Sequence, residues 1–162
     1  MAGMKMPFLY SVEREYETPI DTLWNAWVDP KALEVWYSPT QLSVVPGSVE
    51  NVAEVGGIWT VAVDVPLNNS VAYFYGKYQE VLRHERLVHT LCYTEDATDF
   101  QGRVEAEHHD IVIEFKQLGS KSWVKFSQFG TLPEGQAAMA QAGMESYFDN
   151  LGLYLARGTR LA

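Results

Sequence analysis

The sequence has little cysteine and no long hydrophobic run. Cys92 is the single cysteine, so no disulfide can form within the chain, as is usual in a reducing compartment. No stretch approaches the ~20 consecutive apolar residues that a membrane-spanning helix needs. The first residues carry one charge, Lys5, without the apolar core of a secretory signal. These absences predict a cytoplasmic protein with no membrane span.

The sequence is also poor in positive charge. It holds 12 Lys and Arg against 21 Asp and Glu, which gives a formal net charge of −9 at pH 7. That balance repels a phosphate backbone and argues against nucleic acid as a partner. We find no nucleophile-elbow, phosphate-loop or dinucleotide-binding motif, so no cofactor is predicted and the catalytic residues stay unknown. The 162 residues, 47% of them hydrophobic, predict one globular domain over residues 1–162.

A strand and two short helices are expected at the start of the chain. Residues 8–17 alternate loosely and carry Phe, Tyr and Val, which indicates a strand. Thr18 fits a helix N-cap in a capping-box pattern, with Pro19 at the first helical position. Asp29-Pro30 repeats this arrangement before a second short helix. Ser38-Pro39 ends that helix, because the residue before a proline avoids helical geometry.

The middle of the chain, residues 41–130, is expected to consist of strands and turns. Runs rich in β-branched and aromatic residues are separated by turn signals such as Gly56-Gly57 and Gly119-Ser120. Residues 95–102 are polar and are expected to form a loop. About six or seven consecutive strands without helices between them indicate an antiparallel meander.

One long amphipathic helix is predicted after Pro133. Apolar residues recur there at steps of three and four and form one stripe from Ala137 to Leu155. Gly158 then fits a helix C-cap. A helix of about 24 residues would be ~36 Å long.

The sheet and this helix together predict a cavity. A helix is ~10 Å wide and strands lie ~4.8 Å apart, so one helix covers the apolar face only if the sheet curls around it. The curled sheet leaves space beside the helix, and the two short helices close one side of it. The fold class is therefore α+β: a curved antiparallel sheet of about six or seven strands around a long C-terminal helix, with two short helices after the first strand.

Side-chain alternation along the strands selects candidate residues for the wall of this cavity. Neighbouring strand residues point to opposite faces of a sheet, and the apolar set marks the inner face. The second short helix and the C-terminal helix are expected to complete the wall. The candidate ligand-binding residues are Trp36, Trp59, Val61, Val63, His89, Leu91, Tyr93, Glu107, His109, Ile111, Ile113, Val124, Phe126, Met144, Tyr147 and Phe148.

A set of short motifs follows in a fixed order from Val12 to Leu155. The motifs are Leu23-Trp24-Asn25-Ala26-Trp27-Val28-Asp29-Pro30, Trp36-Tyr37-Ser38-Pro39, Gly56-Gly57-Ile58-Trp59, Tyr75-Gly76-Lys77-Tyr78, Glu85-Arg86-Leu87-Val88 and Gly143-Met144-Glu145-Ser146-Tyr147-Phe148. The ordered set resembles the START/Bet v 1-like (SRPBCC) superfamily, and within it the branch related to the C-terminal domain of the heat-shock-protein-90 ATPase activator. This resemblance implies the helix-grip fold and a central hydrophobic cavity, and it implies no shared catalytic set. Met144 stands where the family often has Trp, and a flexible Met there is expected to reshape the cavity floor.

Two histidines could carry chemistry. His89 is expected among apolar residues, either as a hydrogen-bonded core residue or as a group that contacts a ligand or transfers a proton. Glu107 and His109 share one strand face, which fits a solvated strand end or a polar contact at the cavity mouth. Together with His108 and Glu105 they also invite a metal interpretation. Adjacent strand residues point to opposite faces, however, so no metal is predicted.

Three functions from different classes remain open at this point. The first is binding of a small hydrophobic molecule, lipid-like or aromatic, in the central cavity. The second is an enzyme of the cyclase, hydrolase or aromatase kind, with His89, His109 or Glu107 as acid–base groups. The third is a chaperone-associated interaction domain, which would present an exposed apolar patch on the outer face of the sheet. A homodimer is compatible with all three.

Overall fold

One antiparallel sheet forms most of the protein. The computed structural model describes residues 6–103 and 107–161. Within these residues, eight strands pair in the order β1-β8-β7-β6-β5-β4-β2, and β3 also pairs with β4. Their bounds are β1 Phe8–Tyr16, β2 Ser43–Val44, β3 Glu50–Asn51, β4 Ile58–Val65, β5 Ser70–Leu82, β6 Arg86–Thr94, β7 His109–Leu118 and β8 Lys121–Phe129.

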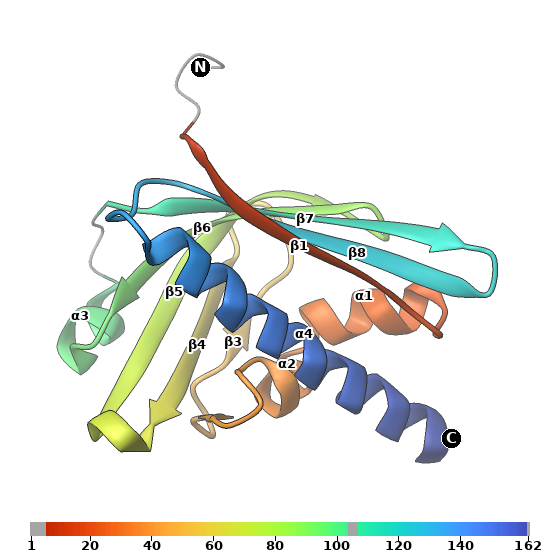
Figure 1. Ribbon diagram of the computed structural model, residues 1–162, viewed down its shortest axis with the longest axis horizontal. Coiled ribbons are helices and arrows are strands. Elements are labelled where there is room, and N and C mark those ends of the chain that lie inside the picture. Colours follow the sequence, from red (N-terminus) through yellow and green to blue (C-terminus); the bar gives the residue numbers. More distant parts are fainter. Residues whose placement is uncertain (1–5, 104–106, 162) are drawn as a thin grey trace.

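The long C-terminal helix and the two short helices after the first strand cover the concave side of this sheet. Figure 1 shows α4 crossing the open side of the curved sheet, with α1 and α2 close to its C-terminal half. The predicted curved antiparallel sheet, long C-terminal helix and two short helices after the first strand are thus confirmed. None of the helices in the described ranges is both long and apolar enough to pass through a lipid bilayer. The helices are α1 Ile20–Val28, α2 Pro30–Trp36, α3 Ala97–Gly102 and α4 Gln136–Leu161, with a short 3-10 turn, η2, at Pro66–Asn68.

Strand β1 anchors the middle of α4. The Arg14 guanidinium donates to Glu145 Oε1 at 2.7 Å and to Asp149 Oδ1 at 2.6 Å. The Tyr16 hydroxyl donates to the carbonyl oxygen of Phe148 at 2.7 Å. Each exposed ion pair contributes only about 0–1 kcal/mol, so these contacts fix the direction of the helix more than they stabilise it. They leave the first turns of α4 over the other end of the sheet.

Large aromatic side chains fill the space beneath the anchored part of α4. Trp27 of α1 lies 4.8 Å from Trp36 and 5.9 Å from Phe148, measured between ring centroids. Trp36 is fully buried, and its Nε1 donates to the Ala26 carbonyl at 2.8 Å. Close packing of this kind leaves few voids. One end of the concave face is therefore closely packed, and the larger open space lies towards the other end.

Three local predictions from the sequence are wrong. Residues 95–102 include the helix α3, because the Asp96 carboxylate caps it by accepting two backbone N–H groups. Pro19, not Thr18, is the N-cap of α1, and no side chain caps that helix. Gly158 lies inside α4, which continues beyond it to its end at residue 161. Propensity at helix ends is a weak signal, and packing of the surrounding chain overrides it here.

Candidate functional site

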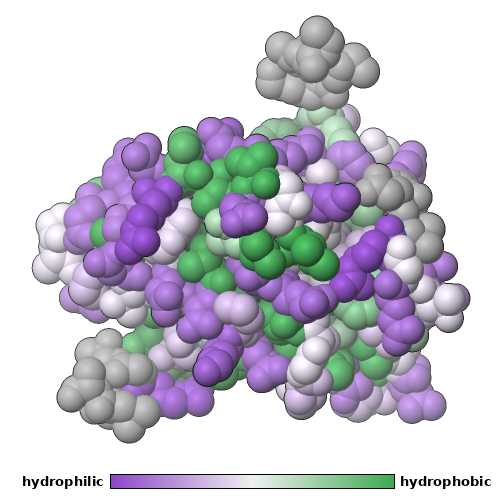
Figure 2. All heavy atoms as spheres, turned by 180° about the vertical axis from the view of Figure 1, so that it is seen from behind, coloured by the Kyte–Doolittle hydropathy of each residue, from purple (hydrophilic) through white to green (hydrophobic). Residues whose placement is uncertain are grey.

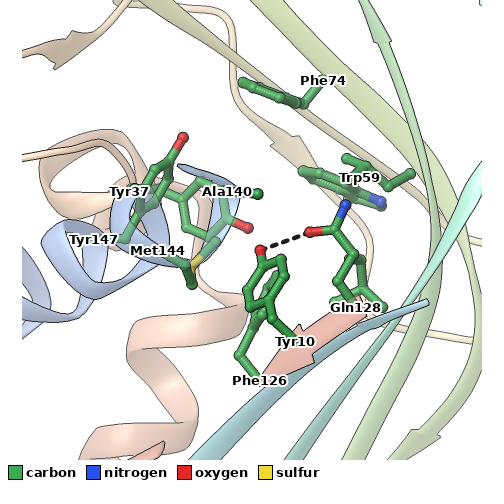
Figure 3. Close-up of a pocket in the computed structure, with 12 residues that line it drawn as sticks. Tyr10, Tyr37, Trp59, Phe74, Phe126, Gln128, Ala140, Met144 and Tyr147 are labelled. Carbon is green, nitrogen blue, oxygen red and sulfur yellow. Dashed lines mark hydrogen bonds between the residues drawn. The ribbon is translucent and has the colours of Figure 1, made fainter. Parts of the chain in front are cut away.

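A cavity of about 250 Å³ lies between the sheet and the N-terminal half of α4. Its wall is mostly apolar and aromatic, and it draws side chains from six strands, from α4 and from the residue that follows α2. Figure 3 shows these side chains around the empty space. The lining residues are Tyr10, Tyr37, Trp59, Phe74, Leu91, Ile111, Phe126, Gln128, Ala140, Gly143, Met144 and Tyr147.

Trp59 forms one wall of the cavity because Gly76 leaves room for its indole. The Trp59 side chain extends from β4 across β5, and its Nε1 donates to the Thr90 carbonyl of β6 at 2.9 Å. A Cβ at Gly76 would overlap that carbonyl oxygen and would lie 2.6 Å from Trp59 Nε1. Both contacts are closer than real Cβ contacts, so any other residue at position 76 would displace the indole. The glycine therefore has a direct role in shaping the cavity.

The polar groups in the cavity are three tyrosine hydroxyls and one amide. The Tyr10 hydroxyl donates to Gln128 Oε1 at 2.7 Å, as the dashed line in Figure 3 shows. Across residues 6–103 and 107–161, no hydrogen bond joins the hydroxyl of Tyr37 or Tyr147 to another residue. Burial raises the pKa of all three phenols above the ordinary value, and neighbouring tyrosines add to the effect at Tyr37 and Tyr10. These phenols are therefore neutral near pH 7.

A wider space of about 570 Å³, which we call the vestibule, continues the cavity towards the surface. Phe74, Leu91, Gln128 and Ala140 line both spaces, so the two adjoin. The vestibule reaches solvent, because the side chains at its rim include Met139, which is 67% exposed. Its other lining residues are Tyr93, Glu107, His109, Leu132 and Gln136.

His109 connects the vestibule to the polar group of the cavity. Its Nδ1 lies 2.7 Å from Gln128 Nε2, and its Nε2 lies 3.2 Å from the Thr131 carbonyl oxygen. A Cβ at Gly130 would overlap the imidazole ring, so the glycine makes space for this orientation. His109 is therefore held at the boundary between Gln128 and the rim.

His89 does not line the cavity. It is 4% exposed, and its ring centroid lies 4.3 Å from that of Trp59 and 5.5 Å from that of Tyr78. Its Nδ1 lies 2.8 Å from the Thr90 carbonyl oxygen. Burial lowers the pKa of His89 to about 4, so the imidazole is neutral near pH 7. It borders a separate void of about 20 Å³, as a hydrogen-bonded core residue would.

The predicted site residues fall into three groups. Alternation identifies the inner face of each strand, but it does not tell how far along the strand the helices fill that face. Those at the cavity are Trp59, Leu91, Ile111, Phe126, Met144 and Tyr147. Those at the vestibule are Tyr93, Glu107 and His109. Those packed in the core, away from both spaces, are Trp36, Val61, Val63, His89, Ile113, Val124 and Phe148.

Several lining residues were not among the candidates from the sequence. Tyr10 has the same parity on β1 as the buried Val12, which is a usable signal. The sequence of α4 carried another signal. Ala140 and Gly143 are small residues near the start of the helix, on the face that carries large side chains further along. Small residues on that face leave the space open. Gln128 was placed on the inner face but was not named as a site residue. The residues missed are Tyr10, Tyr37, Phe74, Gln128, Ala140 and Gly143.

His108, which precedes β7, and His109, its first residue, do not assemble a metal site with their described neighbours. Among the described residues, no group of three or more His, Cys, Asp or Glu side chains is placed to hold a metal ion. His108 Nδ1 lies 3.5 Å from Asp110 Oδ1, whereas the ring of His109 turns to Gln128. Glu105 lies outside the described residues.

Exposed apolar side chains are spread over the surface. Large ones occur on β1, α2, η2, β7 and α4, where hydrophilic residues separate them. Figure 2, which views the protein from behind, shows hydrophobic residues in the middle of this face with hydrophilic residues among and around them.

A curved antiparallel sheet that holds a long C-terminal helix over an apolar cavity defines a helix-grip domain of the START/Bet v 1-like (SRPBCC) class. The model of one family within this class, described as Activator of Hsp90 ATPase homolog 1-like protein, matches residues 17–156. The chain therefore belongs to that family, and the resemblance noted in the sequence is confirmed. No curated protein matches the chain.

Solved structures with the same architecture come from several bacteria. The AHSA1 protein from Silicibacter pomeroyi superposes with a TM-score of 0.78 at 15% identity, covering 92% of this chain and 98% of that one. A protein from Nitrosomonas europaea has a TM-score of 0.74 at 18% identity, with coverages of 93% and 96%. A protein from Chromobacterium violaceum has a TM-score of 0.73 at 19% identity, with coverages of 89% and 94%. At these identities the likenesses concern the fold alone.

Proposed function

We propose that this protein binds one small, mostly apolar molecule in the cavity under the N-terminal half of α4. The observation that carries the proposal is a hollow with an aromatic wall, few polar groups and a way out through the vestibule. Small-molecule sites are concave and mostly apolar, with a few polar groups that fix the orientation of the ligand. Membership of a helix-grip family is consistent with a ligand-binding domain.

The size of the cavity restricts the ligand. An apolar cavity of roughly 150 Å³ in another protein holds benzene, and drug-sized ligands occupy roughly 300–1,000 Å³. The cavity of about 250 Å³ lies between these cases and suits a molecule of one or two rings. A longer ligand would extend into the vestibule.

The electrostatics of the cavity favour a neutral ligand. Its phenols stay protonated because burial raises their pKa, and no charged side chain lines it. A charged ligand would lose its hydration without gaining a partner of opposite charge. Of the groups considered for acid–base catalysis, His89 lies in the core and the other two stand at the vestibule. We therefore favour binding over catalysis.

Filling the cavity tests this function. Naphthalene, followed by isothermal titration calorimetry, should bind the wild-type protein with a stoichiometry of one. Ala140→Phe places a ring in the space where the ligand would lie, so we expect it to abolish binding. Ala138→Phe is the matched control, because Ala138 is exposed on the same helix; it should bind like the wild type. Ala140→Leu provides a smaller filler should the Phe variant be unstable. Equal binding to wild type and both Ala140 variants would contradict the proposal.

A further inference from the structure

Three side chains form a hydrogen-bonded chain from the cavity to the rim. The Tyr10 hydroxyl lies 2.7 Å from Gln128 Oε1, and Gln128 Nε2 lies 2.7 Å from His109 Nδ1. The far nitrogen of that ring, Nε2, lies 3.2 Å from the Thr131 carbonyl oxygen. Tyr10 and Gln128 are cross-strand partners on β1 and β8, and His109 begins β7 on the other side of β8. The chain is thus built into the register of the sheet.

The Thr131 carbonyl sets the direction of every bond in this chain. A carbonyl oxygen only accepts, so His109 Nε2 carries the hydrogen. The Gln128 amide nitrogen faces the other ring nitrogen, Nδ1, and can only donate, so Nδ1 accepts its hydrogen. The amide oxygen must therefore face Tyr10. Because that oxygen also only accepts, the Tyr10 hydroxyl has to donate its single hydrogen to it.

This direction fixes what Tyr10 offers to a ligand. Its hydrogen is engaged by Gln128, so its oxygen presents lone pairs and acts as an acceptor towards the cavity. Tyr37 and Tyr147 also line the cavity, and the hydroxyl of each keeps its hydrogen available for donation. The cavity therefore pairs one obligatory acceptor with two groups that can donate. The ligand group that satisfies both kinds of partner is a hydroxyl, which has one hydrogen and two lone pairs.

We infer that the cavity selects a neutral phenol or alcohol of one or two rings, with Tyr10 as the specificity-determining acceptor for its hydroxyl. This inference rests on the proposed binding function and refines it. An ether or ketone of the same size could accept from Tyr37 or Tyr147, but it would place lone pairs against the Tyr10 oxygen. A hydrocarbon would leave the hydroxyls of Tyr37 and Tyr147 without a partner and would offer no hydrogen to the Tyr10 oxygen, which is unfavourable in a buried site.

Three probes of similar size separate these cases: 2-naphthol, 2-methoxynaphthalene and 2-methylnaphthalene. The first donates and accepts, the second only accepts, and the third does neither. A net hydrogen bond of this kind changes affinity by about three- to tenfold. Calorimetric titration of the wild-type protein at pH 7.5 should therefore give 2-naphthol a Kd roughly three- to tenfold below that of 2-methoxynaphthalene.

Tyr10→Phe tests the acceptor directly. It removes the oxygen and keeps the ring, which stacks on Phe126 at 6.3 Å between centroids, so the fold should be retained. The preference for 2-naphthol over 2-methoxynaphthalene should disappear, while the Kd for 2-methylnaphthalene stays within about twofold of wild type. Tyr73→Phe is the control, because Tyr73 stacks on Phe100 outside the cavity. Gln128→Leu should also reduce the preference, since it releases the Tyr10 hydrogen for donation to the ether.

The outcomes distinguish this inference from the function on which it rests. If all three probes bind the wild type equally, or if the preference survives Tyr10→Phe, the acceptor role is wrong while the binding function stands. If 2-methylnaphthalene and 2-naphthol both fail to bind, the binding function itself is wrong, and the inference falls with it. Selective loss of the 2-naphthol advantage in Tyr10→Phe alone among the Tyr→Phe variants supports it.

Discussion

Lowering the pH should destabilise this protein through His89. The pKa of this buried imidazole is about 4 in the folded protein against an ordinary value of 6.5. Between these values the unfolded chain binds a proton that the folded chain does not. The free energy of unfolding therefore falls as the pH drops below 6.5, by about 1.4 kcal/mol per unit. The difference of 2.5 units, 6.5 minus 4, amounts to about 3 kcal/mol, all of it lost below pH 4.

Urea unfolding at several pH values, with His89→Gln as the comparison, measures how much His89 contributes to the pH dependence of the free energy of unfolding. Glutamine does not titrate in this range, and the carboxylates are the same in both proteins. The difference in free energy of unfolding, wild type minus variant, therefore isolates the effect of His89. That difference should shift by about 2–3 kcal/mol in favour of the variant between pH 7.5 and 4.5. His108→Gln is the comparison for the substitution itself, because the His108 side chain lies nearer the surface. A wild-type-minus-His89→Gln difference that does not change with pH would refute the assignment of His89 to a closed core. So would a loss of naphthalene binding in His89→Gln.

Two glycine substitutions give opposite predictions for stability. Gly76→Ala should destabilise the protein by about 1–3 kcal/mol and alter the fluorescence of Trp59, since the new Cβ would overlap Thr90 and approach the indole; unchanged fluorescence would argue against a role for Gly76 in placing the indole. Gly143→Ala should stabilise the protein by up to about 1 kcal/mol in a thermal melt, because a Cβ there meets no atom within 4 Å and helix propensity improves; a lower Tm would indicate that this part of α4 is under strain.

The architecture was predictable because its signals are periodic and long. Alternation along the strands and the three- and four-residue stripe of α4 both depend on local sequence, and both predictions hold. The short helix α3 was missed because a single capping residue, Asp96, supports it rather than an apolar stripe. Boundaries such as Thr18 and Gly158 failed because helix ends depend on the chain that packs around them.

The position of the hollow along the sheet was not predictable in the same way. Val61 and Ile113 have the inward parity that the sequence indicated, yet they lie where the helices fill the concave face. Which end is filled depends on how Arg14 and Tyr16 hold α4, and these contacts join residues more than 130 positions apart. Likewise, the chain from Tyr10 through Gln128 depends on strand register, which alternation alone does not supply.

A crystal structure of the protein grown with naphthalene tests the central claim most directly. The account predicts ligand density in the cavity, in contact with Trp59, Phe126 and Met144, with the backbone of the sheet and of α4 unchanged. Side chains such as Tyr37 or Tyr147 collapsed into the space would contradict it. Density found only in another part of the molecule would contradict it equally.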